Sequence, residues 1–103
     1  MKLQSLMTAS AIALGLSVAV AAHSLDGQQY LKAAKVSLQQ ARKIALDALP
    51  GGKIVDEELE TEKGGSGLRY SFDVATQAGT REVGVDAKTG AVLENSAEGA
   101  KKD

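Results

Sequence analysis

The spacing of apolar residues changes at Pro50-Gly51-Gly52, and this change constrains the fold more than any other feature of the chain. Before it, apolar residues recur at helical spacing, and after it they alternate with polar residues, as in half-buried strands. A helix is predicted over residues 37–49, because Ser37 and Gln40 match a capping box and Pro50 disfavours continuation. Its apolar face consists of Leu38, Ala41, Ile44, Ala45, Ala48 and Leu49. The three alanines suit close packing on a sheet.

Four strands are predicted after this helix, with glycine-containing turns between them. They cover residues 54–61, 68–75, 82–86 and 91–94, and Val55 and Leu59 are expected on one face of the first strand. Because the connections are too short for crossovers between parallel strands, neighbouring strands should be antiparallel. The predicted fold class is α+β: the main helix packs on a four-stranded antiparallel meander, a short helix precedes it within residues 24–35, and the other sheet face is exposed to water.

The first 22 residues differ from the rest of the chain, because 15 of them are apolar and Lys2 is their only charged side chain. A basic residue before an uncharged run that ends in small residues is typical of a secretory signal peptide. Cleavage is expected after Ala21 or Ala22. The alternative is an uncleaved membrane anchor, for which the 17 uncharged residues 6–22 are at the lower limit of length. The predicted organisation is a signal peptide (1–22), an N-terminal flank (23–35), a folded domain (36–95) and a disordered tail (96–103).

An exported chain of this kind is expected in the periplasm or outside the cell, without stable membrane insertion after signal cleavage. It has no cysteine, so no disulfide can support its core. Removal of residues 1–22 leaves 11 basic and 13 acidic residues. Nucleic-acid binding normally requires a strongly basic surface, so no nucleic-acid partner is predicted.

Residues able to support catalysis are scarce. The single histidine, His23, lies at or beside the expected new N-terminus, where a base is not held in fixed geometry. The glycines at 64, 65 and 67 precede a strand, whereas a phosphate-binding loop opens a helix, so they are interpreted as a hairpin loop. Asp86 and Thr89 are interpreted as turn residues that bond to the backbone, with Gly90 at positive φ. No catalytic residue and no cofactor is predicted.

An acidic stretch in the first predicted strand provides an alternative function. Asp56, Glu57, Glu58 and Glu60 could bind a divalent metal ion weakly, and the protein would then be a cation-responsive envelope protein. The simpler interpretation is a solvated strand face whose charges discourage edge-to-edge aggregation. The stretch lacks the spacing of a calcium loop, in which oxygen ligands alternate around a glycine. No metal site is therefore assigned to it.

The order of these segments resembles that of PepSY domains, which occur in propeptides of secreted metallopeptidases and in small exported bacterial proteins. The similarity covers about residues 36–94 and rests on Val36-Ser37-Leu38, Gln40-Ala41, Ile44-Ala45, Leu49 to Ile54, Glu58-Leu59-Glu60, Tyr70 with Val74, and Val85 to Leu93. The resemblance implies a helix against an antiparallel sheet and a non-enzymatic role in inhibiting, chaperoning or regulating a peptidase or another envelope protein. Gly84 departs from the pattern, since many relatives carry a larger residue there.

We therefore expect an exported binding module that contacts a protein partner in the cell envelope through its sheet. The contact would be made by the exposed strand face that includes Arg69, Ser71 and Asp73, or by an unpaired sheet edge that accepts a strand of the partner. The sequence does not distinguish the two edges.

Overall fold

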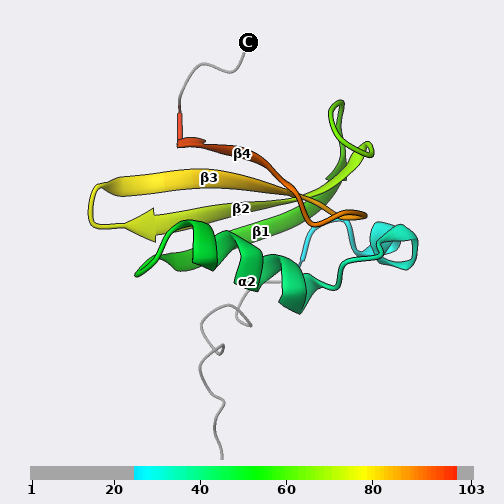
Figure 1. The fold of residues 1–103 in the computed structure, drawn as a ribbon, viewed down its shortest axis with the longest axis horizontal. Helices are drawn as coiled ribbons and strands as arrows, with labels where there is room; N and C mark the ends of the chain where they lie inside the picture. The colour runs from blue at the N-terminus through cyan, green and yellow to red at the C-terminus, as the bar shows by residue number, and fades with distance from the viewer. Residues whose placement is uncertain (1–24, 100–103) are drawn as a thin grey trace, which may run out of the picture.

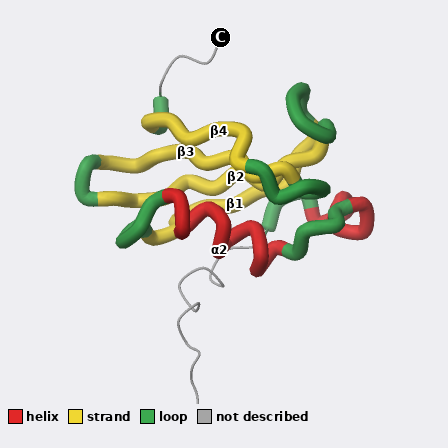
Figure 2. Tube along the Cα trace, viewed as in Figure 1, coloured by secondary structure: helices red, strands yellow, loops and turns green. Residues whose placement is uncertain are grey.

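A computed structural model describes residues 25–99 as an α-helix packed on one sheet (Figure 1). The elements are, in order, the 3-10 helix η2 (Gln28–Ala33), the α-helix α2 (Leu38–Ala48), and the strands β1 (Lys53–Thr61), β2 (Leu68–Thr76), β3 (Gly79–Asp86) and β4 (Val92–Ala97). The strands lie in the order β1-β2-β3-β4, and all neighbours are antiparallel. The predicted fold class is confirmed, and the short preceding helix is of the 3-10 type. Figure 2 shows α2 along one face of the sheet, and we call the opposite face the open face.

The helix α2 begins where the sequence predicts. Gln40 N–H donates to Ser37 Oγ (3.0 Å) and Ser37 N–H donates to Gln40 Oε1 (2.8 Å), so the capping box is formed. Leu49 is the C-cap, and Pro50 follows it. Ala41 and Ala45 are fully buried against the sheet, because their small side chains let the backbone of α2 approach it closely.

The core lies between α2 and the sheet. Its central members, all fully buried, are Tyr70, Phe72 and Val74 of β2 and Val83 and Val85 of β3. The Tyr70 hydroxyl donates a hydrogen bond to the carbonyl oxygen of Val36 (2.7 Å). The polar end of this aromatic side chain therefore has a partner in the segment that leads into α2.

The first strand differs from the prediction at Val55. Ile54 lies opposite Val74 and Asp56 lies opposite Asp73, so Val55 is an extra residue in β1, a β-bulge. Val55 is 41% exposed, whereas Ile54 is 4% exposed. The prediction that Val55 and Leu59 share one face is wrong, because the bulge interrupts the alternation of side chains and places Ile54 in the core.

The last strand is longer than predicted. Ser96 and Ala97 lie opposite Glu82 and Arg81, and Glu98 N–H donates to Thr80 O (2.9 Å). The prediction of a disordered tail from residue 96 is wrong for residues 96–98. These residues carry little apolar surface, and backbone pairing with β3 holds them in place.

The predicted signal peptide (1–22), its cleavage position and His23 lie outside the described residues, as do residues 100–103 of the predicted tail. Between residues 25 and 99, no helix has the length and apolar content needed to cross a bilayer.

Candidate functional site

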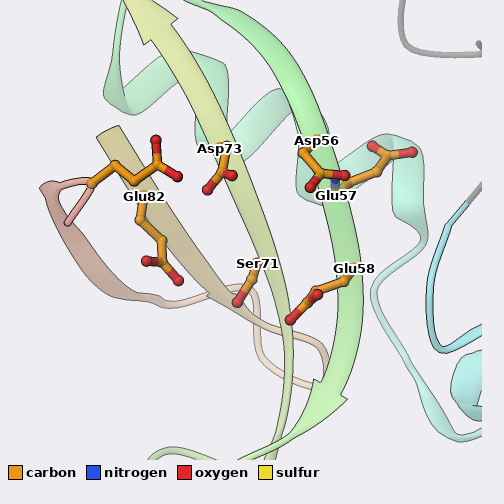
Figure 3. A pocket seen from close by; sticks show the side chains of 7 residues that line it. Asp56, Glu57, Glu58, Ser71, Asp73 and Glu82 are labelled. Atoms are coloured by element: carbon orange, nitrogen blue, oxygen red, sulfur yellow. The ribbon is translucent and has the colours of Figure 1, made fainter. Parts of the chain in front are cut away.

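The open face contains a hollow of about 230 Å³, which we call the acidic hollow (Figure 3). It is lined by Asp56, Glu57 and Glu58 of β1, Ser71 and Asp73 of β2, Glu82 of β3, and Glu98 after β4. No lysine or arginine is among these lining residues. The hollow is therefore a concave surface of one sign of charge.

Strand register brings these carboxylates together. Asp73 in β2 lies opposite Asp56 in β1 on one side and opposite Glu82 in β3 on the other. Directly opposed residues share a face, and their Cβ atoms are about 4.5–5.5 Å apart. Carboxylates from three neighbouring strands consequently lie side by side. Alternation in the sequence predicts the strands. It does not predict their registers, which place these acidic residues next to one another.

Asp73 lies at the centre of the acidic hollow. Burial raises the pKa of its carboxyl group above the ordinary value, and the charges of Glu98, Glu82 and Asp56 raise it further. Like charges this close disfavour ionisation of one another. The ionised hollow is thus under electrostatic repulsion that a positively charged group would relieve.

A second carboxyl group on the same face, Glu60, is also perturbed. Burial raises its pKa above the ordinary value, and a hydrogen bond with Glu58 acts in the same direction. The Ser71 hydroxyl donates to Glu60 Oε2 (2.8 Å) and acts in the opposite direction. Negative charge therefore continues from the hollow along β1.

The predicted acidic cluster is divided between the two faces of the sheet. Glu57 is 3% exposed and its carboxylate turns toward α2, where it accepts hydrogen bonds from Arg42 Nε (2.9 Å) and Nη2 (2.7 Å). In Figure 3 its side chain points away from those of Asp73 and Glu82. Sequence reasoning missed this ion pair, because Arg42 and Glu57 lie on different elements and only the packing of α2 on the sheet brings them together.

The structure gives no grouping of metal ligands for the remaining members of that cluster. Asp56, Glu58 and Glu60 lie on the open face of β1, and a hydrogen bond joins the side chains of Glu58 and Glu60. In residues 25–99, no three histidine, aspartate or glutamate side chains are grouped so that they could hold a metal ion. The geometry thus gives the cation-binding alternative no support.

The predicted contact face is only partly accessible. Arg69 and Ser71 are each 8% exposed, so the expectation that their side chains are exposed is wrong, whereas Asp73 is partly accessible. Ser71 nevertheless lines the acidic hollow. The Arg69 side chain lies over Gly84 and donates from Nη1 to Glu94 Oε1 (3.4 Å). A Cβ on Gly84 would lie 3.1 Å from Arg69 Nη1. Glycine at this strand position therefore makes room for a buried arginine.

Asp86 holds two loops together at one end of the sheet. It is 1% exposed. Its Oδ1 accepts hydrogen bonds from Lys88 N–H (2.8 Å), Thr89 N–H (3.1 Å) and the Ser66 hydroxyl (2.8 Å), and its Oδ2 accepts one from Ser66 N–H (2.7 Å). Burial acts to raise the pKa of Asp86, but these hydrogen bonds outweigh it and lower the pKa to about 2. The predicted turn role is confirmed, with Gly90 at φ 84°, and Ser66 is an addition from the β1–β2 loop.

Asp73→Asn is expected to raise the thermal unfolding midpoint at pH 7. Because folding raises the pKa of Asp73, its ionised carboxylate opposes folding above that pKa, and asparagine removes the charge. Below the ordinary pKa of 3.8, the carboxyl group is protonated in both states, so the advantage should disappear. Circular dichroism melts at pH 7 and about pH 3 test this. A midpoint at pH 7 that is unchanged or lower in the variant would contradict it, and Asp47→Asn on α2 provides the control.

A family model matches more than half of the chain. The family is PepSY, described as the peptidase propeptide and YPEB domain, and the match covers residues 35–95. This range includes α2, β1, β2, β3 and most of β4. No curated protein and no solved structure matches the chain.

Proposed function

The chain belongs to the PepSY family, and from this premise we propose that it is an exported, non-enzymatic module that binds a protein of the cell envelope. Domains of this family are generally non-catalytic inhibitory or propeptide modules. The proposed location is the periplasm or the exterior of the cell, which the signal-like residues 1–22 support. The proposed partner is a peptidase or another envelope protein whose activity the module regulates.

The acidic hollow is the observation that carries the proposed mode of binding. Its carboxylates come from different strands and repel one another, as the raised pKa of Asp73 indicates. A lysine or arginine side chain of the partner would relieve this repulsion on entering the hollow. Such an interaction would accelerate association and would weaken with added salt.

The chemistry of the chain favours binding over catalysis. It has no cysteine, and its only histidine, His23, lies beside the predicted cleavage positions. Asp86, whose pKa is lowered to about 2, is 1% exposed and its oxygens are occupied by loop hydrogen bonds. It therefore stabilises the fold and is not placed to reach a substrate.

Crosslinking in the native envelope tests the proposed partner. A reagent that activates carboxylates and couples them directly to lysine amines is applied to cells that express the protein, and mass spectrometry identifies the linked residues. We expect one envelope protein to be crosslinked repeatedly to the open face, through Glu58, Asp73 or Glu82. Crosslinks confined to α2, or spread over unrelated proteins in proportion to their abundance, would contradict the proposal.

Charge variants test the hollow itself against the partner so identified. The double variant Asp73→Asn and Glu82→Gln should weaken binding by about tenfold at low salt, because it removes two carboxylates from the proposed contact. Asp47→Asn and each single variant are the controls for the loss of one charge: Asp47 lies on the exposed side of α2, with 67% of its side chain exposed. Equal affinity of the wild type and the double variant would show that the hollow is not the contact.

The mass of the protein recovered from cells tests export. A chain that begins at Ala22 or His23 and is found outside the cytoplasm is the expected result. An intact Met1 in a membrane fraction would support the uncleaved anchor instead and would overturn the proposed localisation.

A further inference from the structure

The sheet has two edge strands, β1 and β4, and the N-terminal segment covers part of β1. Leu59 N–H donates to Asp26 O (2.8 Å), within a parallel bridge between Asp26 and Glu58. Gly27 follows at φ 91°, and a Cβ on it would collide with the carbonyl oxygen of Leu59. This close approach and the bulge at Val55 leave little regular edge on β1 for another strand.

The outer side of β4 is paired with no segment that the structure describes (Figure 1). Glu98 N–H donates to Thr80 O, which fixes the direction of the ladder. In an antiparallel strand the backbone groups of successive residues point alternately to the two sides. Ser96 therefore directs its N–H and C=O toward β3, whereas Asn95 and Ala97 direct theirs outward. These two residues offer backbone donors and acceptors to an added strand.

The two faces beside this edge differ in charge. Arg81 lies on the helix side and donates from Nε to Asn95 Oδ1 (2.9 Å) and from Nη2 to Asn95 O (2.8 Å). That carbonyl oxygen has a second lone pair, so an added strand can share it. Glu94 is opposite Gly84 and therefore lies on the open side, where it is paired with Arg69 (3.4 Å). Glu98 lies on the same side and lines the acidic hollow.

We propose that an extended segment of the partner adds to β4 as a fifth, antiparallel strand and carries lysine or arginine at alternate positions. This inference rests on the proposed function and specifies how the partner is held. Directly opposed residues share a face, so the partner residue opposite Ser96 lies on the open side, between Glu94 and Glu98. A positive side chain on this partner residue, or on a partner residue two positions before or after it, would lie beside the acidic hollow. The intervening residues would lie near Arg81, which disfavours a positive charge there.

The geometry of a strand links its backbone and side-chain directions. Partner residues that exchange hydrogen bonds with Asn95 and Ala97 lie directly opposite them and thus on the helix side. The basic partner residues lie on the open side, and their own N–H groups point away from β4. Blocking the N–H groups of the uncharged residues should prevent binding, and blocking those of the basic residues should not.

Synthetic peptides of alternating lysine and threonine, six residues long and capped at both ends, provide the probe. They are titrated into the ¹⁵N-labelled protein, with shifts and hydrogen exchange of backbone amides as the readout. We expect shifts and slowed exchange at Asn95 and Ala97. N-methylation of every threonine should weaken binding about tenfold or more, because the hydrogen bonds to β4 are lost. N-methylation of every lysine should change it little, and a glutamate–threonine peptide should not bind.

Other results would overturn this inference. Equal binding of the two methylated peptides would mean attraction to charge without strand addition, and shifts confined to β1 would place the added strand at the other edge. Slowed exchange at Asn95 and Ala97 without peptide, in a protein that sediments as a dimer, would make a second copy of the chain the occupant. If the native partner crosslinks to the hollow while β4 is unaffected by every peptide, strand addition is contradicted and the proposed function stands. If no specific partner is found, both the proposed function and strand addition are contradicted.

Discussion

Asp86→Ala is expected to lower the free energy of unfolding by about 3 to 4 kcal/mol. The substitution leaves the N–H groups of Ser66, Lys88 and Thr89 without the carboxylate that accepts their hydrogen bonds. Hydrogen bonds to charged groups contribute about 1.5–3 kcal/mol each, and the buried Asp86 carboxylate accepts one from each of these N–H groups. Since domains of this size without disulfides rarely exceed about 3 to 5 kcal/mol of stability, the variant should be close to unfolding. Urea denaturation followed by circular dichroism measures the loss.

Two milder variants keep this prediction testable if Asp86→Ala does not fold. Ser66→Ala removes one hydroxyl donor to Asp86 and keeps the backbone N–H of Ser66, so its expected cost is only about 1 kcal/mol. Asp86→Asn keeps the shape of the side chain and removes the charge. If Asp86→Asn is as stable as the wild type at pH 7, the carboxylate does not hold the two loops as we infer.

The same carboxylate makes stability depend on pH in a defined direction. Its pKa is about 2 in the folded protein and 3.8 ordinarily, so ionised Asp86 contributes about 2 kcal/mol above pH 4. This contribution is lost as the pH falls from about 4 toward 2. The difference in unfolding free energy between the wild type and Asp86→Asn should narrow over that interval, opposite in sign to the effect of Asp73.

Phe72→Ala is expected to cost about 3 to 5 kcal/mol, which again approaches the whole stability of such a domain. Phe72 is fully buried, and its ring stacks on that of Tyr70 with centroids 6.2 Å apart. Its removal leaves a cavity between α2 and the sheet that the surrounding side chains fill only in part. The midpoint of urea denaturation is the measurement, and Phe72→Leu, with an expected loss below about 1.5 kcal/mol, is the variant that remains folded.

Leu49→Ala provides the comparison for Phe72→Ala. From the sequence alone both residues belong to the core, and both truncations would be expected to be similarly severe. In the structure Leu49 is the C-cap of α2 and only half-buried, so its loss should cost about 2 kcal/mol or less. If the two variants lose equal free energy of unfolding, the core is centred closer to the C-terminal end of α2 than the structure places it.

Sequence signals that act over a few residues correctly predicted where elements begin and turn. The capping box at Ser37 placed the start of α2, and the turn chemistry of Asp86 and Gly90 placed the β3–β4 turn, because in each case the interacting groups are within four residues of each other. The errors arose where alternation alone was used to assign a face. Val55 lies on a bulge, which adds one residue to β1 without any recognisable sequence mark.

The candidate site was only partly predictable for a related reason. The sequence pointed to Asp56, Glu58 and Asp73, but it grouped Glu57 with them and treated Arg69 and Ser71 as exposed. Burial of Arg69 depends on Gly84, which is 15 positions away in the chain and adjacent across the sheet. A pattern read along one strand contains no information about what covers its side chains from the next strand.

The sequence by itself determined the order and type of the elements, the antiparallel meander and the resemblance to the PepSY family, because periodicity, caps and turns act over a few residues. Only the tertiary structure decided that carboxylates of three strands meet in one hollow, that Glu57 pairs with Arg42, and that Asp26 covers part of the β1 edge. These features depend on strand register and on how α2 and the N-terminal segment pack against the sheet. Both are set by the summed contacts of the whole core, which no local segment contains.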